Sequence, residues 1–346
     1  MIGRSTRQAF DWLLDPKIRS VAITGICKNA GKTTLLNHLL ALDPVLPQGV
    51  FSTGIDGEET DTVFRNPKPR VKLPAGCVFC CDTATLDKQA SSVSVLGKLP
   101  LSDHLRQLWL ARAEENLQTE ITGPATVGEQ TKTLEMMLAQ GFRRVFIDGS
   151  LDRKSISLSE AVDAVVLLLG ASFGSPSSVQ MELQRLLTLN SIPVTDLLDI
   201  DINNRIELLT RSCISYSLAG KWHATAFDSL IGSEKQLSGI LAQKPDKLYV
   251  PGAMTDPMLS RLKGMLSEHP LQIVFRHPDC IKLSLAKLDS FLVQFGVRVL
   301  IEFKIRTFVL NSQAIGTPAV DADLFRSRLR NEFPDLDLPD IRELVQ

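Results

Sequence analysis

The sequence lacks an excess of charge of either sign, and it lacks a long hydrophobic run. Its 38 Lys and Arg residues and 39 Asp and Glu residues give a net charge of −1, which does not indicate nucleic acid or an anionic membrane as partner. The longest apolar run, around Ala164 to Leu169, is too short to cross a bilayer. No apolar signal-peptide core follows Met1. We therefore expect a cytoplasmic protein that binds neither nucleic acid nor membrane.

Cysteine is scarce, at six residues, but three of the thiols are clustered. Cys77, Cys80 and Cys81 form a C-x-x-C-C pattern, which supplies three of the four ligands of a closed zinc or iron–sulfur site. The sequence has no second C-x-x-C pair and no nearby His pair as the missing ligand. Val78 and Phe79 between the thiols favour a buried strand, where cysteine acts as a small apolar residue. We predict buried, metal-free thiols, and leave open a site shared across a homodimer.

The segment from Val21 to Thr34 reads V-A-I-T-G-I-C-K-N-A-G-K-T-T. A β-rich run ends at Thr24, a turn of small residues follows, and Gly-Lys-Thr-Thr leads into the helical pattern of residues 35–40. Strand, loop, Gly-Lys-Thr and helix form the layout of a phosphate-binding P-loop. In such a loop the backbone N–H groups and the helix N-terminus bind phosphate oxygens.

The P-loop prediction assigns a role to each residue of this segment. Lys32 is expected to reach the β- and γ-phosphates, and the Thr33 hydroxyl is expected to bind Mg²⁺. Five residues separate Gly25 from Gly31, one more than in the common pattern. The predicted nucleotide-binding residues are Gly25, Lys28, Asn29, Ala30, Gly31, Lys32, Thr33 and Thr34.

Two carboxylates are predicted to complete the magnesium site. Asp148 ends an apolar stretch at 142–147, as the acidic residue of a Walker B motif does. Asp56 opens an acidic loop after the strand predicted at 50–55, and Asp61 in the same loop is left open. The carboxyl ends of parallel strands are where an α/β sheet binds its ligand. The predicted catalytic residues are Lys32, Asp56 and Asp148, and the predicted magnesium ligands are Thr33, Asp56 and Asp148.

The order of the elements predicts an α/β fold of the P-loop NTPase type. Apolar strands alternate with helical patterns as far as residue 189, which indicates a mainly parallel sheet with helices on both faces. A helix is also expected over residues 101–116. A boundary near residue 245 separates a P-loop nucleotide-binding domain, residues 1–245, from a smaller C-terminal α/β subdomain, residues 246–346.

Six segments suggest a family. They are T-G-I-C-K-N-A-G-K-T-T at 24–34, G-I-D-G-E-E at 54–59, P-K-P-R at 67–70, T-G-P-A at 122–125, I-D-G-S-L-D-R-K-S at 147–155 and V-P-G-A at 250–253. Together they resemble the B subunit of the lysine 5,6-aminomutase reactivase, a factor that keeps an adenosylcobalamin-dependent aminomutase active. The resemblance covers about residues 18 to 310, and the cysteine cluster departs from it. It implies a second reactivase ATPase subunit and a cobalamin-dependent aminomutase as partners.

The first functional hypothesis is therefore an ATP-dependent reactivation factor that uses Mg²⁺. The sequence has no Asn-Lys-x-Asp guanine motif, which favours ATP, and Asn190 and residues 199–204 are candidate base contacts.

One alternative is an ATP-dependent ligase of the dethiobiotin synthetase or cobyrinate amidase kind, whose loops resemble this one in carrying an inserted residue. An amidase would usually carry a Cys–His glutaminase module, which the five His residues do not provide. Another alternative is a metal-insertion NTPase with the cysteines as its cargo site. The sequence leaves open whether the chain forms a homodimer.

Overall fold

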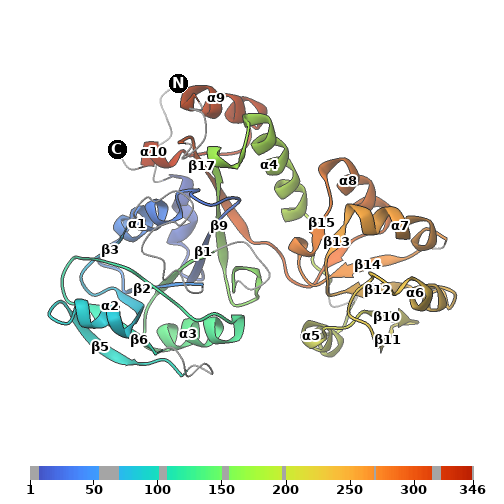
Figure 1. Ribbon diagram of the computed structural model, residues 1–346, viewed down its shortest axis with the longest axis horizontal. Helices are drawn as coiled ribbons and strands as arrows, with labels where there is room; N and C mark the ends of the chain where they lie inside the picture. Colours follow the sequence, from blue (N-terminus) through green and yellow to red (C-terminus); the bar gives the residue numbers. More distant parts are fainter. Residues whose placement is uncertain are drawn as a thin grey trace. The chain divides into compact units, whose positions relative to one another are not determined.

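The chain folds into two compact units. The computed structural model describes residues 8–53, 70–100, 107–149, 156–196, 200–268, 270–313 and 321–344. Unit 1 comprises residues 1–180 and 304–346, and unit 2 comprises residues 181–303. The chain leaves unit 1 within helix α4 (Pro176–Asn190) and returns to it before strand β17 (Ile305–Asn311), which lies beside the much earlier β9 (Ala164–Gly170) (Figure 1).

These units differ in extent from the domains predicted at 1–245 and 246–346. The predicted boundary follows a change of pattern along the chain, whereas the units follow contacts in space. Because β17 pairs in parallel with β9, the last residues of the chain belong with the first. A pairing between segments so distant in sequence leaves no local signal.

Unit 1 contains an eight-stranded sheet among its described residues, in the order β17-β9-β1-β8-β2-β4-β6-β5. The strands from β17 to β4 are parallel to their neighbours, β6 is antiparallel to β4, and β5 is antiparallel to β6. A separate ribbon pairs β3 with β7. The remaining strands are β1 (Ser20–Gly25), β2 (Gln48–Ser52), β3 (Val71–Leu73), β4 (Val78–Asp82), β5 (Val93–Lys98), β6 (Leu108–Ala113), β7 (Leu117–Thr119) and β8 (Arg144–Asp148).

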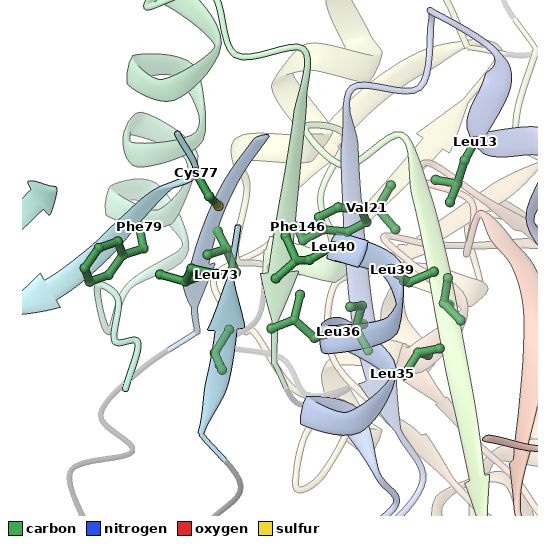
Figure 2. Packing of buried hydrophobic residues seen from close by; sticks show 14 of the residues in the cluster. Leu13, Val21, Leu35, Leu36, Leu39, Leu40, Leu73, Cys77, Phe79 and Phe146 are labelled. Atoms are coloured by element: carbon green, nitrogen blue, oxygen red, sulfur yellow. The ribbon is translucent and has the colours of Figure 1, made fainter. Parts of the chain in front are cut away.

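Helices cover both faces of this sheet. The helical elements of unit 1 are η1 (Gln8–Leu14), α1 (Lys32–Leu42), α2 (Thr83–Lys88), α3 (Val127–Ala139), η2 (Ile156–Leu158), η3 (Ala171–Phe173), α9 (Ala322–Glu332) and α10 (Ile341–Leu344). Figure 2 shows Leu35, Leu36, Leu39 and Leu40 of α1 packed with Val21 and Phe146 of the sheet. Burying side chains of this size contributes about 1.5–3 kcal/mol each, so this packing is what holds α1 against β1.

The opposite face of the sheet is covered by α3. Successive side chains of a strand point to opposite faces, so Val145 lies on the face away from Phe146 and α1. A Cβ atom built on Gly49 would lie 2.9 Å from Met137 Sδ of α3 and 3.4 Å from Val145 Cγ2. Gly49 thus lets α3 approach β2 closely. The predicted mainly parallel sheet with helices on both faces matches this arrangement.

One secondary-structure prediction was wrong. Residues 101–116 were expected to form a helix, but β6 occupies residues 108–113 and pairs with β4 and β5. Most of its side chains are buried, in the pattern of a covered strand rather than of an amphipathic helix. The pairing partners decided the outcome, because a short apolar run does not distinguish helix from strand by itself.

Unit 2 has a five-stranded sheet in its described part, in the order β11-β10-β12-β14-β16. The strands β12, β14 and β16 are parallel to one another, β10 is antiparallel to β12, and β11 is antiparallel to β10. A short ribbon pairs β13 with β15. The elements are α5 (Ile202–Thr210), β10 (Ser215–Leu218), β11 (Lys221–Ala224), α6 (Glu234–Leu241), β12 (Lys247–Val250), β13 (Met254–Thr255), α7 (Asp256–Leu266), β14 (Gln272–Phe275), η4 (Pro278–Cys280), β15 (Ile281–Lys282), α8 (Leu285–Gln294) and β16 (Arg298–Val299).

Among the described residues, no helix has both the length and the apolar character that a membrane span requires.

Candidate functional site

The predicted P-loop segment folds as a strand, a tight loop and a helix. β1 ends at Gly25, and α1 begins at Lys32 with Gly31 as its N-cap residue. Asn29 and Gly31 have φ angles of 57° and 94°. Left-handed backbone of this kind suits Gly and is tolerated by Asn, so the sequence Asn-Ala-Gly fits this turn.

Close packing holds the loop against the sheet. A Cβ atom on Gly25 would lie 2.8 Å from Ala30 Cβ, closer than a real Cβ contact allows. A Cβ atom on Gly170, which ends the neighbouring strand β9, would lie 3.0 Å from Cys27 Sγ and 3.1 Å from Ala30 Cα. The two glycines therefore create the space into which the loop folds.

The first turn of α1 suits an anion. Gly31 supplies no side-chain hydrogen bond to the N–H groups at the start of the helix. These N–H groups and the helix dipole together favour bound negative charge. Lys32, Thr33 and Thr34 are each partly exposed in this turn. The structure therefore brings the predicted loop residues together in an arrangement that fits a phosphate group.

Two opposing influences act on the pKa of the Cys27 thiol in the loop. Burial raises the pKa of Cys27, and the positive charge of Lys32 acts in the opposite direction. An ammonium group stabilises a thiolate only from close by. The Lys32 charge therefore lies within electrostatic range of the Cys27 thiol, although burial has the larger effect on its pKa.

Asp148 lies on the face of the sheet that α1 covers. It ends β8, which is parallel to β1 and adjacent to it. Phe146 packs with α1, and Asp148, two residues later in the same strand, points to the same face. Lys32, Thr33 and Asp148 are therefore on one face at the carboxyl ends of adjoining strands. A carboxylate at this edge of the sheet could hold a cation beside the loop.

The remaining predicted residues lie outside the described part of the chain or belong to unit 2. Asp56 and Asp61 lie outside the described residues. Asn190 belongs to unit 2. Asp201 accepts hydrogen bonds from the N–H groups of Asn203 and Asn204 at 3.0 Å each and so caps α5.

Sequence reasoning missed two residues at the same edge of the sheet. Asn311 ends β17, and its Nδ2 donates to the carbonyl oxygen of Ala30 at 3.1 Å. Thr53 follows β2, its N–H donates to the carbonyl oxygen of Asp148 at 2.7 Å, and its buried Oγ1 has no hydrogen-bond partner in the described part of the chain. The available signal was a polar residue directly after a buried strand, the same signal that identified Asp148.

The clustered cysteines do not converge. Cys77 and Cys81 belong to the apolar cluster that α1 shares, whereas Cys80 alternates with Cys81 along β4 and points to the other face. Burial raises the pKa of Cys77 and of Cys81 to about 12, and it also raises that of Cys80. Metal ligation requires thiolates. Among the described residues, no group of three or more His, Cys, Asp or Glu side chains is arranged to hold a metal ion.

A cavity of about 630 Å³ opens elsewhere in unit 1. Its lining includes Ile18 before β1, Leu42 at the end of α1 and Arg144 at the start of β8. It therefore lies at the amino ends of the parallel strands, at the opposite edge of the sheet from the loop between Gly25 and Gly31. We assign it no part in the candidate site.

Comparisons with known proteins found little. No family model matches the sequence, and no curated protein matches it. The crystal structure of the chimerical protein CapA2B2 has 14% sequence identity and a TM-score of 0.29, over 52% of this chain and 75% of that chain. The MinC:MinD cell division protein complex of Aquifex aeolicus has 8% identity and a TM-score of 0.27, over 84% of this chain and 81% of that chain. TM-scores this low do not establish a shared fold.

Proposed function

We propose that the chain binds Mg–ATP at the loop from Gly25 to Thr34 and hydrolyses it. The observation that carries the proposal is the uncapped first turn of α1, with Lys32 and Thr33, beside the strand that ends in Asp148. Phosphate groups would accept hydrogen bonds from the backbone N–H groups there. The absence of an Asn-Lys-x-Asp motif supports ATP over GTP.

Each residue then has a defined task. Lys32 would neutralise charge on the β- and γ-phosphates, and the Thr33 hydroxyl and the Asp148 carboxylate would hold the cation. Magnesium, when bound, would neutralise the charge that develops on the phosphate oxygens. The glycines at 25 and 170 keep the loop folded against the sheet.

The test is ATP binding by calorimetry to the wild-type protein and to Lys32→Ala. We expect wild-type protein to bind Mg–ATP and Lys32→Ala to lose detectable binding, because a charge-assisted contact to phosphate is removed. Lys132→Ala, at an exposed position of α3, removes the same charge away from the loop and should bind normally. Unchanged affinity in a folded Lys32→Ala variant would contradict the P-loop assignment.

The finer proposal is that ATP use serves the reactivation of an adenosylcobalamin-dependent aminomutase. Its support is the sequence resemblance, including T-G-I-C-K-N-A-G-K-T-T and I-D-G-S-L-D-R-K-S. The partners would be a second reactivase ATPase subunit and the aminomutase. The buried, divergent cysteines argue against the metal-insertion alternative, which needs them as an accessible cargo site.

The finer proposal has its own measurement. Affinity-tagged protein incubated in native lysate with ATP, with ADP or without nucleotide should retain a cobalamin enzyme in a nucleotide-dependent manner, identified by mass spectrometry. The purified enzyme should then stimulate ATP turnover. Turnover that no cobalamin enzyme changes would reject the reactivase role and leave ATP hydrolysis standing.

A further inference from the structure

Asn311 is a buried polar residue that touches the phosphate loop from the last strand of the sheet. Its side chain is only 6% exposed. Nδ2 donates to the carbonyl oxygen of Ala30 at 3.1 Å and to that of Asn29 at 3.5 Å. Oδ1 accepts from the N–H of Gln313 at 3.1 Å, which fixes the orientation of the amide. Both ends of this side chain are thus engaged with backbone.

The two hydrogen bonds that Asn311 Nδ2 donates determine the direction in which the N–H groups of the loop point. In a trans peptide the C=O of one residue and the N–H of the next point in opposite directions. Holding the Ala30 carbonyl toward Asn311 therefore directs the Gly31 N–H away from Asn311. The same holds for the Asn29 carbonyl and the Ala30 N–H. Asn311 thus orients the N–H groups at the entrance to α1, which are the groups a phosphate would use.

Residues of the C-terminal segment, 326–340, hold the backbone on both sides of Asn311. Asp340 is fully buried, and its Oδ2 accepts from the N–H of Ser312 at 3.1 Å. The N–H of Leu310 donates to the carbonyl oxygen of Pro339 at 2.8 Å. Arg326 of α9 donates to Ser312 Oγ at 3.0 Å and lies 3.7 Å from Asp340 Oδ2. The residues on both sides of Asn311 are therefore held by the end of the chain.

Helix α10 also contacts the loop directly. A Cβ atom on Gly31 would lie 3.1 Å from Ile341 Cδ1 and 3.0 Å from Asn311 Nδ2. Ile341 is 4% exposed, and α10 packs against both β17 and α1. The left-handed turn at Gly31 is thus enclosed by two side chains from the C-terminal part of the chain.

We propose that Asn311 and Ile341 form a clamp that fixes the phosphate loop in its binding conformation and thereby sets the affinity for nucleotide phosphates. Asn311 is a positioning residue, because it acts through the loop backbone. The clamp rests on the proposed nucleotide binding. It goes beyond that proposal by making the C-terminal part of the chain, which from Asn311 onward lies 281 or more positions after Ala30, part of the binding site's support.

The test compares Mg–ATP affinity in three variants of the full chain by calorimetry, together with their thermal unfolding midpoints. Asn311→Asp replaces the donor with a carboxylate that faces two carbonyl oxygens, and Ile341→Ala removes the apolar contact. The matched control is Asn37→Asp: Asn37 Nδ2 donates to the carbonyl of Arg70 at 3.1 Å and Oδ1 accepts from the N–H of Lys72 at 2.8 Å. Asn37 links α1 to the backbone at β3 in the same way that Asn311 links the loop to β17, but Asn37 lies away from the proposed phosphate site.

We expect Asn311→Asp and Ile341→Ala each to weaken Mg–ATP binding by about tenfold or more, and Asn37→Asp to weaken it by less than about threefold. A readout specific to the loop is alkylation of Cys27, whose rate should rise in Asn311→Asp and Ile341→Ala but not in Asn37→Asp, because a released loop exposes the thiol.

Three outcomes would overturn the clamp. Wild-type affinity in folded Asn311→Asp and Ile341→Ala would reject the clamp while the nucleotide site stands. Affinity losses in all three variants that simply follow their losses in unfolding temperature would indicate general destabilisation. A wild-type protein that binds no ATP would reject the proposed function and the clamp together. If Asn311→Asp does not fold, Ile341→Ala decides between these outcomes.

Discussion

Ile23 of β1 and Asp148 of β8 are register partners in adjacent parallel strands. The phosphate loop begins two residues after Ile23, at Gly25, so the loop and the Asp148 carboxylate leave the sheet at the same edge. Parallel neighbours necessarily end on the same side, and this is how an open α/β sheet gathers ligand-binding groups from separate parts of the chain. The chemistry predicted for Lys32 and Asp148 depends on that relationship.

Asp148→Asn should lose ATP hydrolysis more than ATP binding. The amide keeps the shape of the side chain but removes the negative charge that would hold the cation. We expect turnover to fall by about tenfold or more, with a smaller change in affinity, measured by phosphate release and calorimetry. Asp82→Asn is the matched control, because Asp82 ends β4 and caps α2, a role that Asn also fills. Equal turnover in Asp148→Asn and wild type would remove Asp148 from the site.

Serine at Cys77, Cys80 or Cys81 should reduce stability without removing a metal. A buried hydroxyl needs a hydrogen-bond partner that a thiol does not, so each substitution should cost about 1–3 kcal/mol of unfolding free energy. Denaturant unfolding measures this cost, and ATP turnover per folded molecule should remain near the wild-type value. Alanine at the same positions is the control, because it removes the sulfur without burying a hydroxyl. Elemental analysis that finds about one metal per chain or per dimer, lost together with activity in the triple serine variant, would show the structural interpretation to be mistaken.

The stability of unit 1 should fall as His38 is protonated. Burial lowers the pKa of His38, and its Nε2 has no hydrogen-bond partner among the described residues. Below the unfolded-state pKa of about 6.5, the unfolded chain binds a proton that the folded chain resists. The contribution of His38 to the unfolding free energy is therefore fully present above that value and decreases as the pH falls through the window down to the lowered folded pKa.

Urea unfolding at several pH values between 5 and 8 tests this dependence. His38→Gln should flatten the pH dependence relative to wild type, while His223→Gln, at an exposed position of β11, should leave it unchanged. A wild-type slope retained in full by His38→Gln would mean that another group is responsible.

Alkylation of Cys27 should depend on Lys32 and on nucleotide. Burial raises the pKa of Cys27 and the charge of Lys32 partly offsets this, so Lys32→Ala should lower the thiolate fraction and slow the reaction with N-ethylmaleimide. Bound Mg–ATP should slow it in wild-type protein by covering the loop. Mass spectrometry of the Cys27 peptide between pH 7 and pH 10 measures the rates, with Lys132→Ala as control. Faster alkylation in Lys32→Ala would contradict the proximity of the two side chains.

Much of the site followed from the sequence because its parts are local. A β-rich run, a turn of small residues and Gly-Lys-Thr before an apolar helix fix a strand, a loop and a helix within residues 20–42, largely through backbone preference and spacing. The strand that ends in Asp148 was also predicted near its observed position, since it is a continuous apolar segment bounded by turn residues.

The tertiary structure decided what depends on distant partners. Residues 108–113 form a strand because β4 and β5 offer their edges to pair with. The three clustered thiols are separated because alternation along β4 sends Cys80 to the face opposite Cys81. Asn311 reaches the carbonyl of Ala30, 281 positions away in the chain, only because β17 returns to pair with β9. The sequence by itself determined the strand, the loop from Gly25 to Gly31 and the helix that follows it, and the non-local pairing of β17 determined which residues hold that loop in place.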